Sequence, residues 1–68
     1  MYEIKEQRGI EEPRSRGVYS ENERTALYNA LDTWHDSADY NRTKITVWHN
    51  GRVFSSYDRR PKEEREND

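Results

Sequence analysis

The stretch that most constrains the fold of this chain is Thr43 to Tyr57, which reads TKITVWHNGRVFSSY. Two runs rich in β-branched and aromatic residues flank Asn50-Gly51. An Asn-Gly pair between two such runs is the strongest local signal for a hairpin with a two-residue turn. The sequence therefore predicts a β-hairpin, and the other elements have to be arranged around it.

A two-residue turn also predicts which residues face each other across the hairpin. It pairs Trp48 with Val53 and Val47 with Phe54. Cross-strand partners share a face of the sheet, and a shift of one residue would exchange the faces. The predicted core face carries Ile45, Val47 and Phe54, and the predicted outer face carries Trp48, Val53 and Tyr57.

Two further elements are predicted before the hairpin. Residues 1–7 alternate apolar and charged side chains, which is typical of a strand. Residues 20–23 match a capping box, so a helix is predicted from Glu21 to about Asp36. Between them, the segment from Arg8 to Val18 contains two glycines and a proline and is predicted to be a loop. The apolar stripe of the helix consists of Leu27, Ala30, Leu31 and Trp34.

Together these elements predict a small single-domain α+β fold with the order β-α-β-β. Three antiparallel strands form the sheet, and the one helix packs on one of its faces. We expect the domain to span residues 1–57 and the charged residues 58–68 to form a disordered, flexible tail. Of 68 residues, 38% are charged and 29% hydrophobic, so the core is small. A homodimer is therefore an open alternative.

Several function classes lack their sequence signals. The chain has no cysteine, which excludes disulfides and thiolate metal sites. It has no apolar run of membrane-spanning length and no stretch of signal-peptide type after Met1. It also has no Gly-rich phosphate loop and no nucleophile motif. We therefore expect a cytoplasmic protein without enzymatic activity, cofactor, bound metal or membrane partner.

The predicted outer face of the hairpin is the first candidate site. Exposed aromatic residues beside cations serve either as anchors of protein interfaces or as platforms for unpaired bases. A third interpretation is that they only stabilise the hairpin or are covered in a dimer. Residues 42–62 carry a net charge of +5, whereas residues 1–41 and 63–68 carry −4 and −3. The candidate partner-binding residues are Lys44, Trp48, Arg52, Val53, Tyr57, Arg59 and Arg60.

One flank of the helix is a second candidate patch. Tyr28, Asp32, His35 and Asp39 fall on one side at 100° per residue. Oxygen and nitrogen ligands of this kind suit a divalent metal, but a solvated helix face or an acidic patch for a basic partner explains them more simply.

These features lead to one leading function and two alternatives. A very short, cysteine-free, highly charged chain is common among small phage-encoded or mobile-element proteins that bind and modulate a host protein. We therefore expect a non-enzymatic, regulatory protein that acts through protein–protein interaction. The first alternative is a nucleic-acid-binding module that uses residues 42–62, although Glu63, Glu64 and Glu66 would repel phosphate. The second alternative is a structural homodimer subunit.

Overall fold

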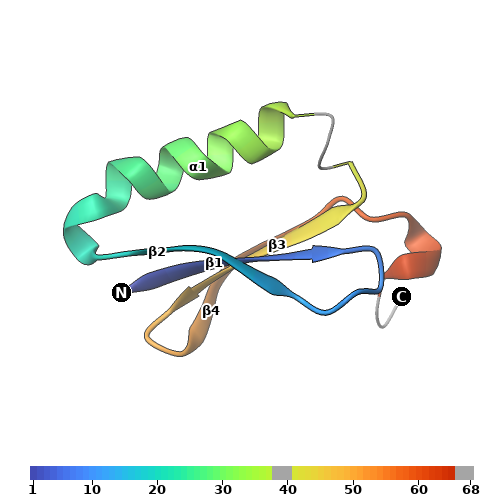
Figure 1. Ribbon diagram of the computed structural model, residues 1–68, viewed down its shortest axis with the longest axis horizontal. Coiled ribbons are helices and arrows are strands. Elements are labelled where there is room, and N and C mark those ends of the chain that lie inside the picture. The colour runs from blue at the N-terminus through green and yellow to red at the C-terminus, as the bar shows by residue number, and fades with distance from the viewer. Residues whose placement is uncertain (38–40, 66–68) are drawn as a thin grey trace.

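The computed structural model describes residues 1–37 and 41–65 (Figure 1). Two strands precede the helix and two follow it. In chain order the elements are β1 (Tyr2–Arg8), β2 (Arg14–Tyr19), the 3-10 turn η1 (Glu21–Glu23), α1 (Arg24–Asp36), β3 (Thr43–His49), β4 (Arg52–Asp58) and the 3-10 turn η3 (Lys62–Glu64). None of the helices in this part of the chain has the length and apolar character needed to cross a membrane.

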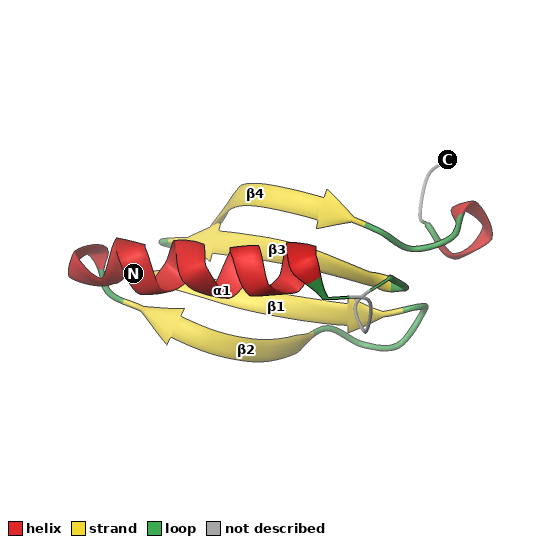
Figure 2. Cartoon of the chain, turned by 90° about the horizontal axis from the view of Figure 1, so that it is seen from above, coloured by secondary structure: helices red, strands yellow, loops and turns green. Residues whose placement is uncertain are grey.

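The strands form one antiparallel sheet in the order β2-β1-β3-β4. Figures 1 and 2 show α1 lying along one face of this sheet, over the central strands β1 and β3. The predicted α+β fold with one helix is confirmed, but the prediction of three strands is wrong. The order is ββαββ, and α1 is the only described element that covers a face of the sheet.

The missing strand is β2, which lies in the segment from Arg8 to Val18 that we predicted to be a loop. Its side chains are mostly exposed, because β2 is an edge strand with little packed against it. An edge strand of this kind shows no alternation of apolar and polar residues, so the usual strand signal is absent. Gly17 weakens the strand signal further, because glycine is unfavourable inside a strand. The pairing of β2 with β1 is also irregular, with a register shift between Ile4 and Lys5.

The core lies between α1 and the inner face of the sheet. Because residues two apart on a strand share a face, Tyr2 and Ile4 of β1 point to the same side as Ile45 and Val47 of β3. The helix contributes its predicted stripe. The buried apolar residues are Tyr2, Ile4, Leu27, Leu31, Trp34, Ile45 and Val47, with Tyr19, Ala30 and Tyr57 partly buried against them.

The helix follows its predicted start closely. The main-chain N–H of Ser20 donates to the Glu23 carboxylate at 2.9 Å, and both arms of the capping box are formed. The first turn is the 3-10 turn η1, and α1 ends at Asp36 as predicted. The buried Trp34 indole N–H donates to the Thr43 hydroxyl at 2.8 Å, which fixes the end of α1 over the start of β3.

The hairpin turn is as predicted, but the register is not maintained along the strands. Asn50 and Gly51 have φ values of 53° and 83°, as a turn with two left-handed residues requires. Trp48 pairs with Val53, but Val47 then pairs with Ser55, because β4 contains one extra residue at Phe54. This β-bulge corrects the predicted pairing of Val47 with Phe54 and changes the face of every later residue of β4.

The C-terminal segment also differs from the prediction. The boundary placed after residue 57 falls inside β4, which runs to Asp58. Arg59 and Arg60 then lie against the folded domain, and the turn η3 follows. The predicted disordered tail is therefore corrected for residues 58–65, and residues 66–68 lie outside the described residues.

Candidate functional site

The face of the sheet opposite α1 carries the candidate site, and we call it the outer face. One row of side chains crosses all four strands there, because Glu3 pairs with both Val18 and Trp48, and Trp48 pairs with Val53. The apolar members of this row are Val18, Trp48 and Val53. Three of the four residues in this row are thus apolar, with Glu3 between Val18 and Trp48, at the end of the sheet nearest the Asn50-Gly51 turn.

Trp48 lies between Glu3 of β1 and Val53 of β4 in this row. Val53 is 55% exposed, and Val18, which Glu3 separates from Trp48, is 51% exposed. The Lys5 ammonium lies 5.3 Å from the centroid of the Trp48 ring, a cation–π contact, and 4.0 Å from the Glu3 carboxylate. Beside Trp48, a hollow of about 480 Å³ extends over β1 and the hairpin turn. The indole is therefore half-buried and held in place, with open space next to it.

The rest of the outer face is polar. The next row consists of Ser15, Lys5, Thr46 and Ser56, which pair across the four strands. Lys44 lies one row further, paired with Gln7 and Asp58. The outer face thus combines one row with three apolar residues and Glu3 with polar rows that contain two lysines.

Two of the predicted site residues do not lie on the outer face. Tyr57 pairs with Ile45 and contacts Trp34 and His35, with ring centroids 6.0 Å and 5.0 Å apart. The prediction that Tyr57 faces outward is therefore wrong, and the bulge at Phe54 is the reason. Arg52 pairs with His49 beside the turn, so it lies on the helix side of the hairpin.

Arg59 and Arg60, the other two predicted site residues, make structural contacts. Arg59 donates to the main-chain oxygens of Trp34 and His35, both at 3.2 Å, at the negative end of the helix dipole. Arg60 is 1% exposed and donates to both carboxylate oxygens of Asp58, at 2.9 Å and 2.8 Å. This contact lowers the pKa of Asp58 below its ordinary value.

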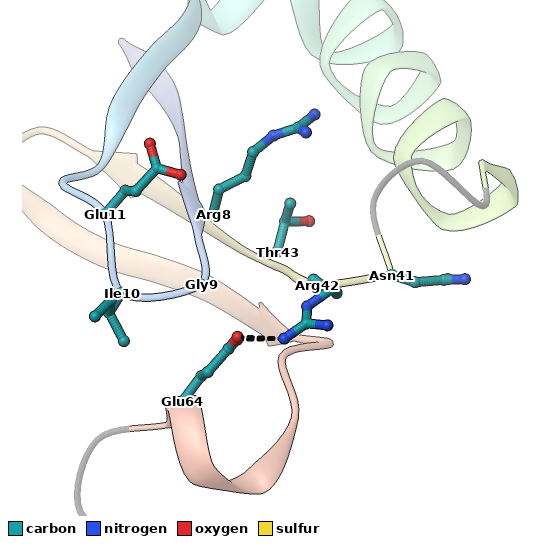
Figure 3. A pocket seen from close by; sticks show the side chains of 8 residues that line it. All are labelled: Arg8, Gly9, Ile10, Glu11, Asn41, Arg42, Thr43 and Glu64. Atoms are coloured by element: carbon teal, nitrogen blue, oxygen red, sulfur yellow. Dashed lines mark hydrogen bonds and ion pairs between the residues drawn. The ribbon is translucent and has the colours of Figure 1, made fainter.

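The basic segment 42–62 therefore does not form one cationic surface. Its first cation, Arg42, donates to Glu64 at 2.7 Å across a hollow of about 530 Å³ (Figure 3). This contact raises the pKa of Arg42. Glu64 thus pairs with Arg42 within the molecule, and Arg59 and Arg60 are engaged as described above. Lys44 is the one predicted site cation that lies on the outer face.

The second candidate patch is only partly described, because Asp39 lies outside the described residues. Tyr28 and Asp32 are exposed on α1, and Arg24 donates to the Tyr28 hydroxyl at 3.4 Å. The ring of His35 makes edge contacts with Trp34 and Tyr57. Among residues 1–37 and 41–65, no three side chains of metal-binding type come together.

The sequence alone did not identify three residues of the outer face: Val18, Glu3 and Lys5. Val18 falls in the predicted loop, and Glu3 and Lys5 were expected only to form the solvent side of a strand. The available signal was the length of the segment from Arg14 to Tyr19, which is sufficient for a strand between Pro13 and the helix cap. Comparisons of the chain with models of protein families, with curated proteins and with solved structures found no match.

Proposed function

We propose that this chain is a small non-enzymatic binding protein that docks a protein partner on the outer face of its sheet. The observation that carries the proposal is the apolar row of Val18, Trp48 and Val53, which no described element covers. Antiparallel sheets commonly leave one face in water, but that face is then normally polar. Tryptophan held beside a lysine is among the side chains that most often dominate binding energy.

The chemistry of the surface indicates the kind of partner. The apolar row would bury the most apolar surface against apolar side chains of a partner. Lys5 lies in the row next to it and Lys44 one row further, so carboxylates of the partner are favoured on this polar side. The interface is expected to be of modest size, because the whole sheet has only four short strands. Binding of this kind would allow a small chain to act as a modulator of its partner.

A nucleic-acid-binding module is the less supported alternative. Trp48 with Lys5 and Lys44 has the elements of a base-stacking surface. However, Glu3 and Asp58 lie on the same face, and Arg42 and Arg60 are paired with carboxylates. Phosphate binding needs an excess of free cations along the groove. The outer face carries no such excess among the described residues.

The test compares two exposed aromatic residues on opposite surfaces. Trp48→Ala removes the centre of the apolar row, whereas Tyr28→Ala removes an exposed ring from α1. Both variants are checked for folding by amide NMR spectra and are then used with wild type to capture partners from the lysate of the source cells. A protein that binds wild type and Tyr28→Ala but not Trp48→Ala is expected, with at least a roughly tenfold loss of affinity.

Two further measurements locate the binding surface and test the nucleic-acid alternative. Hydrogen exchange of the recovered complex should slow at the exposed side of β3 and β4, and gel shifts with single-stranded DNA or RNA at low salt should be absent. The proposal is wrong if Tyr28→Ala, and not Trp48→Ala, loses the partner. Salt-dependent binding of nucleic acid that requires Trp48 would favour the alternative.

A further inference from the structure

Four polar atoms meet at the corner of the molecule where the start of the chain, η1 and the hairpin turn come together. Oε1 of Glu21 accepts from the amino group of Met1 and lies 3.0 Å from Nε2 of His49. The same amino group donates to Oδ1 of Asn50 at 3.0 Å, and the amide nitrogen of Asn50 lies 3.5 Å from Nε2 of His49. These contacts form a ring of two nitrogens and two oxygens, which we call the corner cluster: the Met1 amino nitrogen, Oε1 of Glu21, Nε2 of His49 and Oδ1 of Asn50.

The fold holds the corner cluster in place. The main-chain N–H of Asn50 donates to the carbonyl oxygen of Met1 at 3.2 Å, so the start of the chain is tied to the hairpin turn. The turn in turn fixes Asn50, whose φ is 53°. The ring of His49 stacks on the buried ring of Tyr2, with centroids 4.1 Å apart and planes 16° apart. Three of the four donor groups are therefore positioned before any ligand arrives.

The corner cluster is also accessible from solvent. The side chains of Met1, Glu21 and His49 are 70%, 58% and 31% exposed. A small ion can therefore reach the donor atoms while the core stays closed. Glu21 contributes one negative charge to the cluster, and the two nitrogens are uncharged electron-pair donors once they have lost their protons.

The distances in the corner cluster match a tetragonal metal site. A late transition metal forms bonds of about 2.0–2.1 Å to nitrogen and oxygen, so two donors at a right angle lie about 2.9 Å apart. The contacts from the Met1 amino group to Asn50 and from Glu21 to His49 are both 3.0 Å. Square-planar or tetragonal sets of nitrogen and oxygen are typical of Cu²⁺ and Ni²⁺, whereas Mg²⁺ and Ca²⁺ select oxygen alone.

Local sequence patterns do not reveal this set of donors. Only Glu21 and His49 are side chains of the usual metal-binding types, which agrees with the absence of any group of three in the described part of the chain. These two residues are 28 positions apart. The other two donors are an amino group and an amide oxygen, and only the folded chain brings all four together.

We propose that the corner cluster binds a divalent late transition metal, with Cu²⁺ preferred. The metal takes the place of the hydrogen atoms that the four groups now share. The Met1 amino group and Nε2 of His49 bind in their deprotonated forms, so uptake of the ion releases protons to solvent. The site is independent of the outer face, because His49 and Trp48 are neighbours on β3 and point to opposite sides of the sheet.

Titration with Cu²⁺ alone tests the proposal. Wild type at neutral pH should take up one ion per chain, and electron paramagnetic resonance should show two nitrogen donors. Because Cu²⁺ binds such sites more tightly than Zn²⁺, calorimetry should give at least a roughly tenfold difference between these ions. Mg²⁺ should not bind at millimolar concentration. Cu²⁺ should also raise the unfolding temperature, because the four donors come together only in the folded chain.

Matched variants identify the donors. His49→Phe keeps an aromatic ring against Tyr2 but removes Nε2, and it should weaken Cu²⁺ binding at least roughly tenfold, as should Glu21→Gln. His35→Phe changes the other histidine, which lies on α1, and should bind as wild type does. Acetylation of the Met1 amino group of the synthetic chain removes the second nitrogen donor and should also weaken binding at least roughly tenfold.

Each contrary result has a definite meaning. Binding that is lost on acetylation but unchanged in His49→Phe would show that the amino group holds copper without the corner cluster, and the proposal would be wrong. It would also be wrong if His35→Phe lost the ion, if the acetylated chain bound as wild type does, or if wild type took up no Cu²⁺ at micromolar concentration. If His49→Phe did not fold, the acetylated chain and the number of nitrogen donors in the spectrum of wild type would decide.

Discussion

Among single residues, Arg60 shows how this small domain accommodates a charge in its interior. Its guanidinium donates to both oxygens of Asp58 and to the main-chain oxygen of Gly9 at 3.0 Å. The contact with Gly9 joins the end of β4 to the β1–β2 turn, which is 51 residues away in the chain. Arg60 therefore orders the C-terminal segment as well as neutralising Asp58.

Removal of Arg60 should destabilise the domain severely. Arg60→Ala leaves the Asp58 carboxylate without its main partner and opens a space below the C-terminal segment, so we expect a loss of about 3 kcal/mol in the free energy of unfolding. Urea denaturation followed by circular dichroism measures this loss. Arg52→Ala, at an exposed position beside the hairpin turn, is the control and should change stability by less than about 0.5 kcal/mol. Equal effects of the two substitutions would show that Arg60 contributes no more than a surface charge.

Among the elements, β4 shows how one extra residue decides which side chains of a strand join the core and which lie on the outer face. The bulge at Phe54 turns Tyr57 toward Trp34 and leaves Val53 beside Trp48 on the outer face. Phe54 itself lies at the rim of the core, with its ring 5.4 Å from that of Tyr2. Without the extra residue, Tyr57 would face outward as the turn alone predicts.

Tyr57 should therefore behave as a core residue. Tyr57→Ala removes ring contacts with Trp34 and His35 and should cost about 2 kcal/mol of unfolding free energy, less than a fully buried aromatic residue because Tyr57 is only partly buried. The measurement is thermal or urea unfolding, with Tyr28→Ala as an exposed tyrosine control that should cost well under about 1 kcal/mol. A Tyr57→Ala variant as stable as the control would contradict the register of β4.

Local patterns predicted the elements that have clear periodicity or special turn residues. The Asn50-Gly51 turn, the strand at Tyr2 and the helix cap at Ser20 were predicted from their sequence. The strand β2 was not predicted, because its exposed edge position requires no apolar alternation. Of the candidate site, Lys44, Trp48 and Val53 were placed on the correct face. Tyr57 lies on the other face because of the bulge, and Arg59 and Arg60 are engaged in long-range contacts, both of which depend on tertiary packing that no local pattern reports. Arg52 pairs with His49, as the two-residue turn predicts.

Over the whole molecule, the sheet has two edges, β2 and β4, and each carries an irregularity in its pairing. A bulge twists a strand and interrupts the row of free main-chain groups, which opposes pairing with a further strand. Association through the edges is thus disfavoured, whereas the outer face has no such protection. This distribution agrees with a protein that binds by a sheet face and argues against a dimer joined edge to edge.

The end of the molecule near the hairpin turn is closed by a network of charges. Glu21, at the start of η1, accepts from the Met1 amino group and lies 3.0 Å from Nε2 of His49. The main-chain N–H of Asn50 donates to the Met1 carbonyl oxygen at 3.2 Å. Glu21 thus connects the start of the chain, the start of the helix and the hairpin. The amino group, and then His49, lower the pKa of Glu21 from 4.5 to about 2.

This network should make the fold sensitive to acid. Because the pKa of Glu21 is lower in the folded state, its contribution to stability is present above about pH 4.5 and is lost as the pH falls toward 2. Glu21→Gln should therefore be less stable than wild type at neutral pH, and the two unfolding midpoints should converge by about pH 2. Thermal unfolding between these pH values measures the convergence, and Glu12→Gln, an exposed carboxylate of the β1–β2 turn, should run parallel to wild type. If the difference in unfolding midpoint between Glu21→Gln and wild type does not change with pH, the charge of Glu21 does not stabilise this corner. If high salt removes the pH dependence of this difference, the stabilisation is electrostatic in origin.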